Sequence, residues 1–193
     1  MSHYYTLGEI PHKRHTQFRR KDGSLYAEQL FSTEGFSSDY SLLYHHHAPT
    51  FITKTEEPYD AMPRIAEEKM LKHRSFEGFN IKSEDDFLDS RKAILVNNDC
   101  HVVLAAPRKS MQDYFYKNAD ADEMIFIHKG SGTLRTMMGN ISFEYGDYLI
   151  IPRGMIYQID FDTTENRLFY VESFAPFYTP KRYKNESGQH LEH

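Results

Sequence analysis

Side chains able to bind a metal ion gather at two places in this sequence, the run His45-His46-His47 and the acidic residue Glu123. Divalent first-row metals need about three protein ligands in a fixed geometry, and imidazole and carboxylate groups supply them. In a strand, His45 and His47 point to one side and His46 to the other, so at most two of the histidines converge. A metal site would therefore combine His45 and His47 with Glu123. The alternative is that the histidines form hydrogen bonds or line an interface.

Glu123 also opens a pattern of glycine and proline residues with regular spacing. Six residues separate it from Gly130, and a Gly-Asp pair and a Pro-Arg-Gly turn follow. The members of the pattern are Glu123, Gly130, Gly132, Gly146, Pro152, Gly154 and Tyr157. The pattern resembles the two motifs of the cupin family, in which two histidines precede the glutamate and a third follows the Pro-x-Gly turn. This resemblance implies an antiparallel β-barrel whose turns need these glycines.

The metal-binding half of the cupin motifs is absent. The positions of the first two histidines fall on Tyr116 and Asn118, or on Lys117 and Ala119, and the third falls on Tyr157. One carboxylate and a phenol that is neutral near pH 7 do not make a divalent-metal site. We therefore predict a degenerate barrel with no catalytic residue and no metal ligand in this chain. The glutamate and the phenol of the motif should lie close together inside the barrel or at its mouth.

Short strands separated by turn residues are predicted along the second half of the chain. They are Ala93–Val96, His101–Ala106, Glu123–His128, Gly132–Met138, Ile141–Tyr145, Tyr148–Ile151, Ile156–Phe161 and Leu168–Phe174. Ser83 and the acidic residues after it predict a helix near residues 84–92. The expected fold is mainly β, with residues 1–92 as a β-rich extension that holds one or two short helices. Residues 93–180 should form a cupin-like antiparallel barrel or sandwich.

The composition limits the classes of function. The 193-residue chain has a formal net charge of −5, which argues against general nucleic-acid binding. It has one cysteine, Cys100, and no run of the roughly 20 apolar residues that a membrane helix needs. We expect a cytoplasmic protein with no membrane partner. A basic run that includes Lys13, Arg14, Arg19 and Arg20 is predicted to contact another subunit or domain.

A further pattern lies near the N-terminus. It reads Gly8-Glu9-Ile10-Pro11-His12-Lys13-Arg14-His15-Thr16, and later Ser41-Leu42-Leu43-Tyr44-His45. Together with residues 122–132 and 146–154, these segments resemble the sequences of the homogentisate 1,2-dioxygenase family. The likeness runs from about residue 4 to the last residue.

That resemblance implies a reaction and a cofactor. The family opens the ring of homogentisate with O2 to give maleylacetoacetate in tyrosine and phenylalanine catabolism. It uses one non-haem Fe(II) held by two histidines and a glutamate, and its subunits form trimers that pair into hexamers. Those ligands lie in the C-terminal half of the family sequence, so none is assigned here, and residues 181–193 should lead into that half. The chain alone is expected to be structural and inactive.

Two other functions stay open. A stand-alone cupin metalloenzyme using His45, His47 and Glu123 predicts stoichiometric metal in the purified chain. A metal-free cupin module that binds small molecules predicts ligand binding without metal. The dioxygenase interpretation predicts neither for this chain by itself.

Overall fold

The computed structural model describes residues 17–37, 40–49, 51–67, 72–185 and 189–191. They fall into two compact units that divide between Arg64 and Ile65. The smaller unit contains two antiparallel strands, β1 (Ala27–Ser32) and β2 (Tyr40–His45). The N-terminal run that resembles the dioxygenase family, with Lys13 and Arg14, lies outside the described residues.

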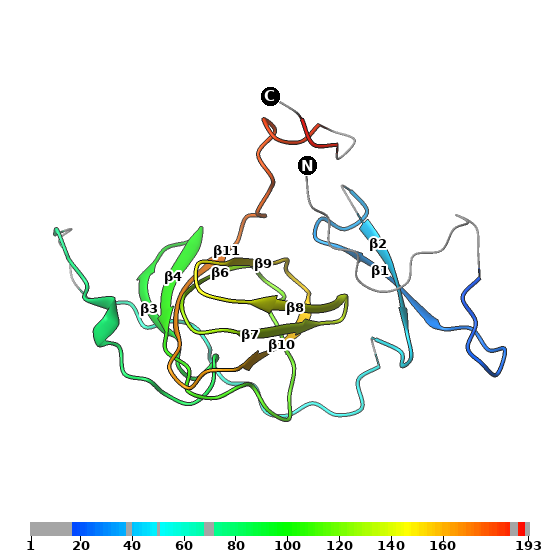
Figure 1. The fold of residues 1–193 in the computed structure, drawn as a ribbon, viewed down its shortest axis with the longest axis horizontal. Helices are drawn as coiled ribbons and strands as arrows, with labels where there is room; N and C mark the ends of the chain where they lie inside the picture. Colours follow the sequence, from blue (N-terminus) through cyan, green and yellow to red (C-terminus); the bar gives the residue numbers. More distant parts are fainter. Residues whose placement is uncertain (1–16, 38–39, 50, 68–71, 186–188, 192–193) are drawn as a thin grey trace. The chain divides into compact units, whose positions relative to one another are not determined.

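The larger unit consists of two antiparallel sheets (Figure 1). One has four strands in the order β5-β10-β7-β8, and the other has five in the order β3-β4-β11-β6-β9. The strands are β3 (Lys92–Val96), β4 (Cys100–Ala105), β5 (Tyr116–Lys117), β6 (Asp122–Lys129), β7 (Gly132–Thr136), β8 (Gly139–Phe143), β9 (Tyr148–Ile151), β10 (Ile156–Phe161) and β11 (Arg167–Ser173). The prediction of a mainly antiparallel β fold is confirmed. Only β5 was not predicted in this unit, because two residues are too few to show an alternating pattern.

The core of the larger unit is built from the side chains that alternate along each strand. In β6, Ile125 and Ile127 are buried, whereas Met124 and Phe126, which alternate with them, are half-buried. Buried apolar side chains from both sheets include Val103, Ile125, Ile127, Leu134, Leu149, Ile151, Ile159 and Leu168. The same alternation buries Glu123, so a charged group enters an otherwise apolar core.

The prediction of a helix near residues 84–92 is wrong, because this segment forms turns. The Ser90 N–H donates to the Asp86 carbonyl at 3.0 Å, but no regular helix follows. Glu84 is instead paired with Pro107 in an isolated parallel bridge, and β3 already begins at Lys92. Too few residues lie between these two anchors to offset the cost of starting a helix.

The residues of the predicted helix pack onto the larger unit. The Ser83 hydroxyl, which was the predicted N-cap, accepts a hydrogen bond from Arg167 at 2.8 Å. Phe87 is fully buried, and its ring centroid lies 5.7 Å from that of Tyr170. The larger unit therefore begins well before residue 93, the residue at which the predicted barrel begins. None of the helices among the described residues is both long and apolar enough to cross a bilayer.

Candidate functional site

Glu123 is the centre of a buried polar cluster in the larger unit. It lies on β6 and is 1% exposed. Its Oε1 accepts a hydrogen bond from the Tyr170 hydroxyl of β11 at 2.6 Å and a longer one from Asn118 Nδ2 at 3.4 Å. Strand pairing places Glu172 of β11 directly opposite Glu123. A buried carboxyl group needs such partners, because burial disfavours its charged form.

The second carboxylate, Glu172, is held by two polar side chains. Asn118 Nδ2 donates to Glu172 Oε1 at 2.6 Å, and His101 Nδ1 lies 2.8 Å from Glu172 Oε2. The amide oxygen of Asn118 accepts the backbone N–H groups of Asp120 and Ala121, both at 3.0 Å. Asn118 thus connects the turn before β6 to both carboxylates, which fixes the orientation of its amide.

Two further tyrosines and one arginine complete the cluster. Tyr157 of β10 is fully buried and pairs with Tyr116 of β5, with ring centroids 5.5 Å apart. The guanidinium carbon of Arg91 lies 5.4 Å from the ring centroid of Tyr116 and 5.7 Å from that of Tyr170. Arginine keeps its charge in proteins, so these are cation–π contacts. The same positive charge also acts on Glu123.

Burial controls the protonation of this cluster. It raises the pKa of the Glu123 carboxyl group above its ordinary value, although hydrogen bonds and the charge of Arg91 oppose the shift. Burial, with the neighbouring carboxylate, also raises the pKa of the phenols of Tyr116, Tyr157 and Tyr170, which therefore stay protonated near neutral pH. The Tyr157 hydroxyl interacts electrostatically with Glu123 but makes no hydrogen bond of standard geometry to any described residue.

Glu123→Gln is expected to flatten the fall in stability of the protein with rising pH. The folded protein holds the Glu123 proton more tightly than the unfolded chain, because burial raises the pKa of this carboxyl group. The resulting stability is fully present below the unfolded pKa, about 4.3, and is lost as the pH rises through the folded pKa. Melting temperatures of the wild type and the variant between about pH 4 and 8 test this.

The control for this measurement is Glu144→Gln, which changes an exposed carboxyl group on the same unit. It removes one surface carboxyl group and is the reference for the effect of Glu123→Gln. If the melting temperatures of the wild type and of Glu123→Gln change in parallel with pH, the Glu123 carboxyl group does not change its proton affinity on folding.

The four cupin ligand positions of the motif lie together in this cluster. The Lys117 and Ala119 side chains, which belong to the other alignment, are exposed. The structure therefore favours the alignment in which the four positions are Tyr116, Asn118, Glu123 and Tyr157. Glu123 and Tyr157 are close enough to interact electrostatically, as the motif spacing predicts.

Most of the glycine and proline residues of the motif lie in turns of the larger unit. Gly130 connects β6 to β7 with a φ of 112°, and Gly146 connects β8 to β9 with a φ of 94°. Gly154 ends the turn that begins at Pro152, and its N–H donates to the Asn118 carbonyl at 2.7 Å. The second motif thus positions the segment that carries Asn118.

The histidine run lies in the smaller unit, where two of its members have partners. His45 Nε2 lies 2.8 Å from Gln29 Oε1, and the His46 ring meets the Tyr26 ring edge-on at 5.2 Å. His47 is exposed. Arg20 of the basic run donates to the His46 carbonyl at 2.6 Å, so part of that run contributes to the smaller unit itself.

The donors of the polar cluster do not fit a divalent metal ion. In the part of the chain that the structure describes, no three His, Cys, Asp or Glu side chains lie together as such a site requires. The four motif positions offer two phenols, one amide and a single carboxylate that Tyr170 already engages. Arg91 adds a positive charge that opposes a second cation. The cluster is suited to holding strands of both sheets together.

Arg91, Tyr170 and Glu172 were not identified as members of the site from the sequence. Arg91 falls within the range of the predicted helix, which gave no reason to place it beside Glu123. A signal was available for the other two, because Leu168, Tyr170 and Glu172 alternate on one side of the predicted strand. An acidic residue on the buried side of a strand indicates a satisfied polar partner in the core.

Sequence comparisons relate the chain to a family of oxygenases. Residues 7–182 match the family described as homogentisate 1,2-dioxygenase N-terminal. A protein of Saccharolobus solfataricus with the provisional name of a dioxygenase is 37% identical over 193 residues, covering 100% of this chain and 49% of that protein. The homogentisate 1,2-dioxygenase of Bradyrhizobium diazoefficiens is 32% identical over 83 residues, covering 42% of this chain and 18% of that protein. The chain spans about half the length of the Saccharolobus relative.

Solved structures with similar folds are more distant. A cupin-2 domain protein of Shewanella frigidimarina gives a TM-score of 0.38 at 21% identity, covering 44% of this chain and 79% of that one. A cupin superfamily protein of Desulfitobacterium hafniense gives 0.43 at 12% identity, covering 55% and 95%. At these scores the likeness adds nothing to the relationship that the sequences establish.

Proposed function

This chain belongs to the family of homogentisate 1,2-dioxygenase N-terminal domains, and we propose that it is the half of a ring-cleaving dioxygenase that does not hold the metal. The observation that supports the proposal is the environment of the Glu123 carboxyl group. Its carboxyl group is buried, bonded to Tyr170 and faced by the charge of Arg91, where a metal-binding cupin would present an open ligand.

The substrate and cofactor of the whole enzyme are part of this proposal. The family name supports homogentisate and O2 as substrates and maleylacetoacetate as product, with Fe(II) bound by residues that this chain does not contain. A relative about twice as long leaves room for those residues. The role of this chain is then to support the catalytic half and to take part in the subunit assembly, for which trimers or hexamers stay a prediction.

The chain alone is expected to show no turnover of homogentisate, whereas the longer protein in which it is followed by the second half should be active. Both are loaded with Fe(II) without oxygen, given homogentisate and O2, and followed by the absorbance of maleylacetoacetate. We expect turnover in the longer protein and none in this chain, because the donors among the residues that the structure describes do not form a three-ligand site.

Glu123→Gln in the longer protein tests whether Glu123 contributes to iron binding there. Iron content and turnover should stay within about threefold of the wild type, a change of less than about 1 kcal/mol, because the glutamate is not a ligand. Iron-dependent turnover by the chain alone, or loss of iron from the Glu123→Gln protein, would overturn the proposal.

A further inference from the structure

The outer face of the five-stranded sheet is apolar from one edge to the other. Strand pairing sets one residue from each strand side by side in a row. The row consists of Leu95, Val102, Val171, Met124 and Ile150, in the order β3-β4-β11-β6-β9. Leu95 is 56% exposed and Ile150 48%. An antiparallel sheet with one face in water normally carries polar side chains on that face.

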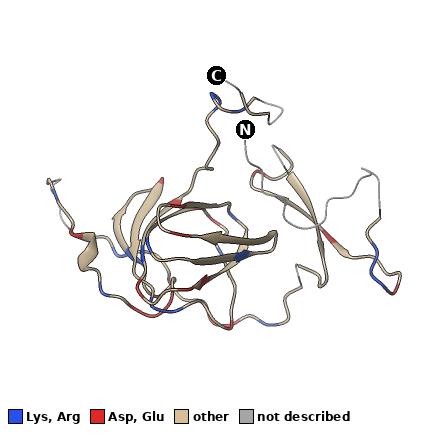
Figure 2. Cartoon of the chain, in the orientation of Figure 1, with Lys and Arg blue, Asp and Glu red and all other residues tan. Residues whose placement is uncertain are grey.

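A second row runs beside the first, and its side chains are larger and mostly aromatic. It consists of Leu104, Phe169, Phe126 and Tyr148 on β4, β11, β6 and β9. Lys92 stands at the β3 end of this row and is paired with Glu84 at 2.7 Å. In Figure 2, β3 and β4 are tan along most of their length, so few of the residues on these two strands are charged.

A groove extends this apolar face. The segment Phe76–Ile81, which contains the 3-10 helix η1 (Gly78–Asn80), lies beside the strands and encloses a groove of about 640 Å³, whose floor includes Leu104, Phe126 and Phe169. Phe79 of η1 meets His128 of β6 edge-on, with ring centroids 4.8 Å apart. The groove and the two rows are continuous through Phe126 and Phe169, and we name them together the apolar face.

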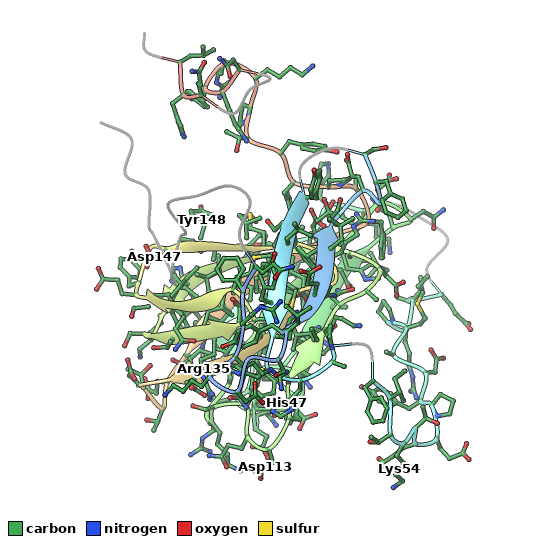
Figure 3. The ribbon with its side chains drawn as sticks, turned by 90° about the vertical axis from the view of Figure 1, so that its right-hand side faces the viewer. His47, Lys54, Asp113, Arg135, Asp147 and Tyr148 are labelled. Atoms are coloured by element: carbon green, nitrogen blue, oxygen red, sulfur yellow. The ribbon has the colours of Figure 1, made fainter. Side chains whose placement is uncertain are left out.

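The four-stranded sheet of the same unit provides the contrast. Its outer rows consist of Gln158, Arg135 and Asn140, and of Asp160, Thr133 and Ser142. These side chains are all polar, and all but the buried Gln158 are exposed or half-buried, as expected on a solvated face. Figure 3 labels Arg135 from this sheet and Tyr148 from the other. One unit thus carries a polar outer face and an apolar one, so the apolar face is not a general property of its strands.

We propose that the apolar face docks the second half of the dioxygenase, the part that makes up the rest of its relatives' length. This inference rests on the proposed function. Contiguous apolar surface with few charges is typical of permanent interfaces, which resemble a divided core. The Saccharolobus relative carries roughly as much chain again as the residues matched here, so a permanent partner of comparable size is at hand.

The size of the face favours a partner on the same polypeptide over a second copy of the chain. Five strands about 4.8 Å apart, over about four residues each, give a flat area of roughly 300 Å². Free dimers bury about 800 Å² per partner. A tethered partner docks within one molecule at a high effective concentration, so a smaller face is sufficient.

The test measures the accessibility of one thiol on each outer face. In a Cys100→Ser background, Ile150→Cys places a thiol on the apolar face, and Ser142→Cys places the matched control on the polar face, where the side chain is exposed. Each variant is made in this chain and in the longer protein, treated with a maleimide, and the labelled peptide is identified by mass. The thiol from Ile150→Cys should label at least tenfold more slowly in the longer protein, and the thiol from Ser142→Cys equally fast in both.

Every other outcome contradicts the proposal. Equal labelling of the Ile150→Cys thiol in both proteins leaves the apolar face open. If the Ile150→Cys thiol is protected in this chain by itself at every protein concentration, another part of the same chain covers the apolar face. If the thiol becomes protected only as the concentration of this chain rises, a second copy of the chain covers the apolar face.

Turnover of homogentisate by the same samples separates this inference from the proposed function. A protected thiol without turnover supports docking but removes the assigned reaction. Turnover with a fully reactive thiol keeps the reaction and removes the docking surface.

Discussion

Tyr157→Ala is expected to lower the free energy of unfolding by about 3–5 kcal/mol, the usual cost of removing a buried aromatic ring. Tyr157 is fully buried and packs against Tyr116 across β5 and β10. Its removal leaves a cavity beside Glu123, in a region where the strands cannot easily close. Urea unfolding of the wild type and the variant measures the difference.

Tyr157→Phe is the matched control, because it removes only the hydroxyl group. That hydroxyl is buried and has no hydrogen-bond partner of standard geometry among the described residues, so its loss should cost less than about 1 kcal/mol. A larger loss would show that the hydroxyl does bond to Glu123. An unchanged stability of Tyr157→Ala would instead place the ring at the surface, against the motif alignment.

Gly132→Ala is expected to cost about 3 kcal/mol, at the upper end of what overpacking usually costs. A Cβ at this position would lie 2.1 Å from the Asp160 carbonyl oxygen and 2.8 Å from Phe143 Cζ. The first of these atoms belongs to the backbone of the paired strand β10, which cannot turn aside as a side chain can. The variant should therefore lose stability in thermal and urea unfolding.

Gly146→Ala separates this close approach from backbone strain. Gly146 has a φ of 94°, but a Cβ there meets no atom within 4 Å. Only the cost of the left-handed conformation applies, about 1–2 kcal/mol. If the two variants lose the same stability, the close contact with β10 is not the reason for a glycine at position 132.

Local pattern was sufficient to predict most of the larger unit. The expected strands Tyr148–Ile151 and Ile156–Phe161 coincide with β9 and β10, because alternation and turn residues act within a few positions. The helix near residues 84–92 failed for the opposite reason. The bridge from Glu84 to Pro107 joins residues far apart in the sequence, and no local propensity shows it.

The sequence by itself determined that neither alignment of the cupin motifs places a histidine at a metal position, and that a single carboxyl group remains at Glu123. It also determined the turns, since the glycines and the proline act through their own backbones. Tertiary structure alone decided that Arg91 and Tyr170 surround this carboxyl group, and that His101 meets Glu172 from 71 residues away. Strand order decides which residues meet in the core, and strand order is set by pairings between distant segments that a linear pattern does not specify.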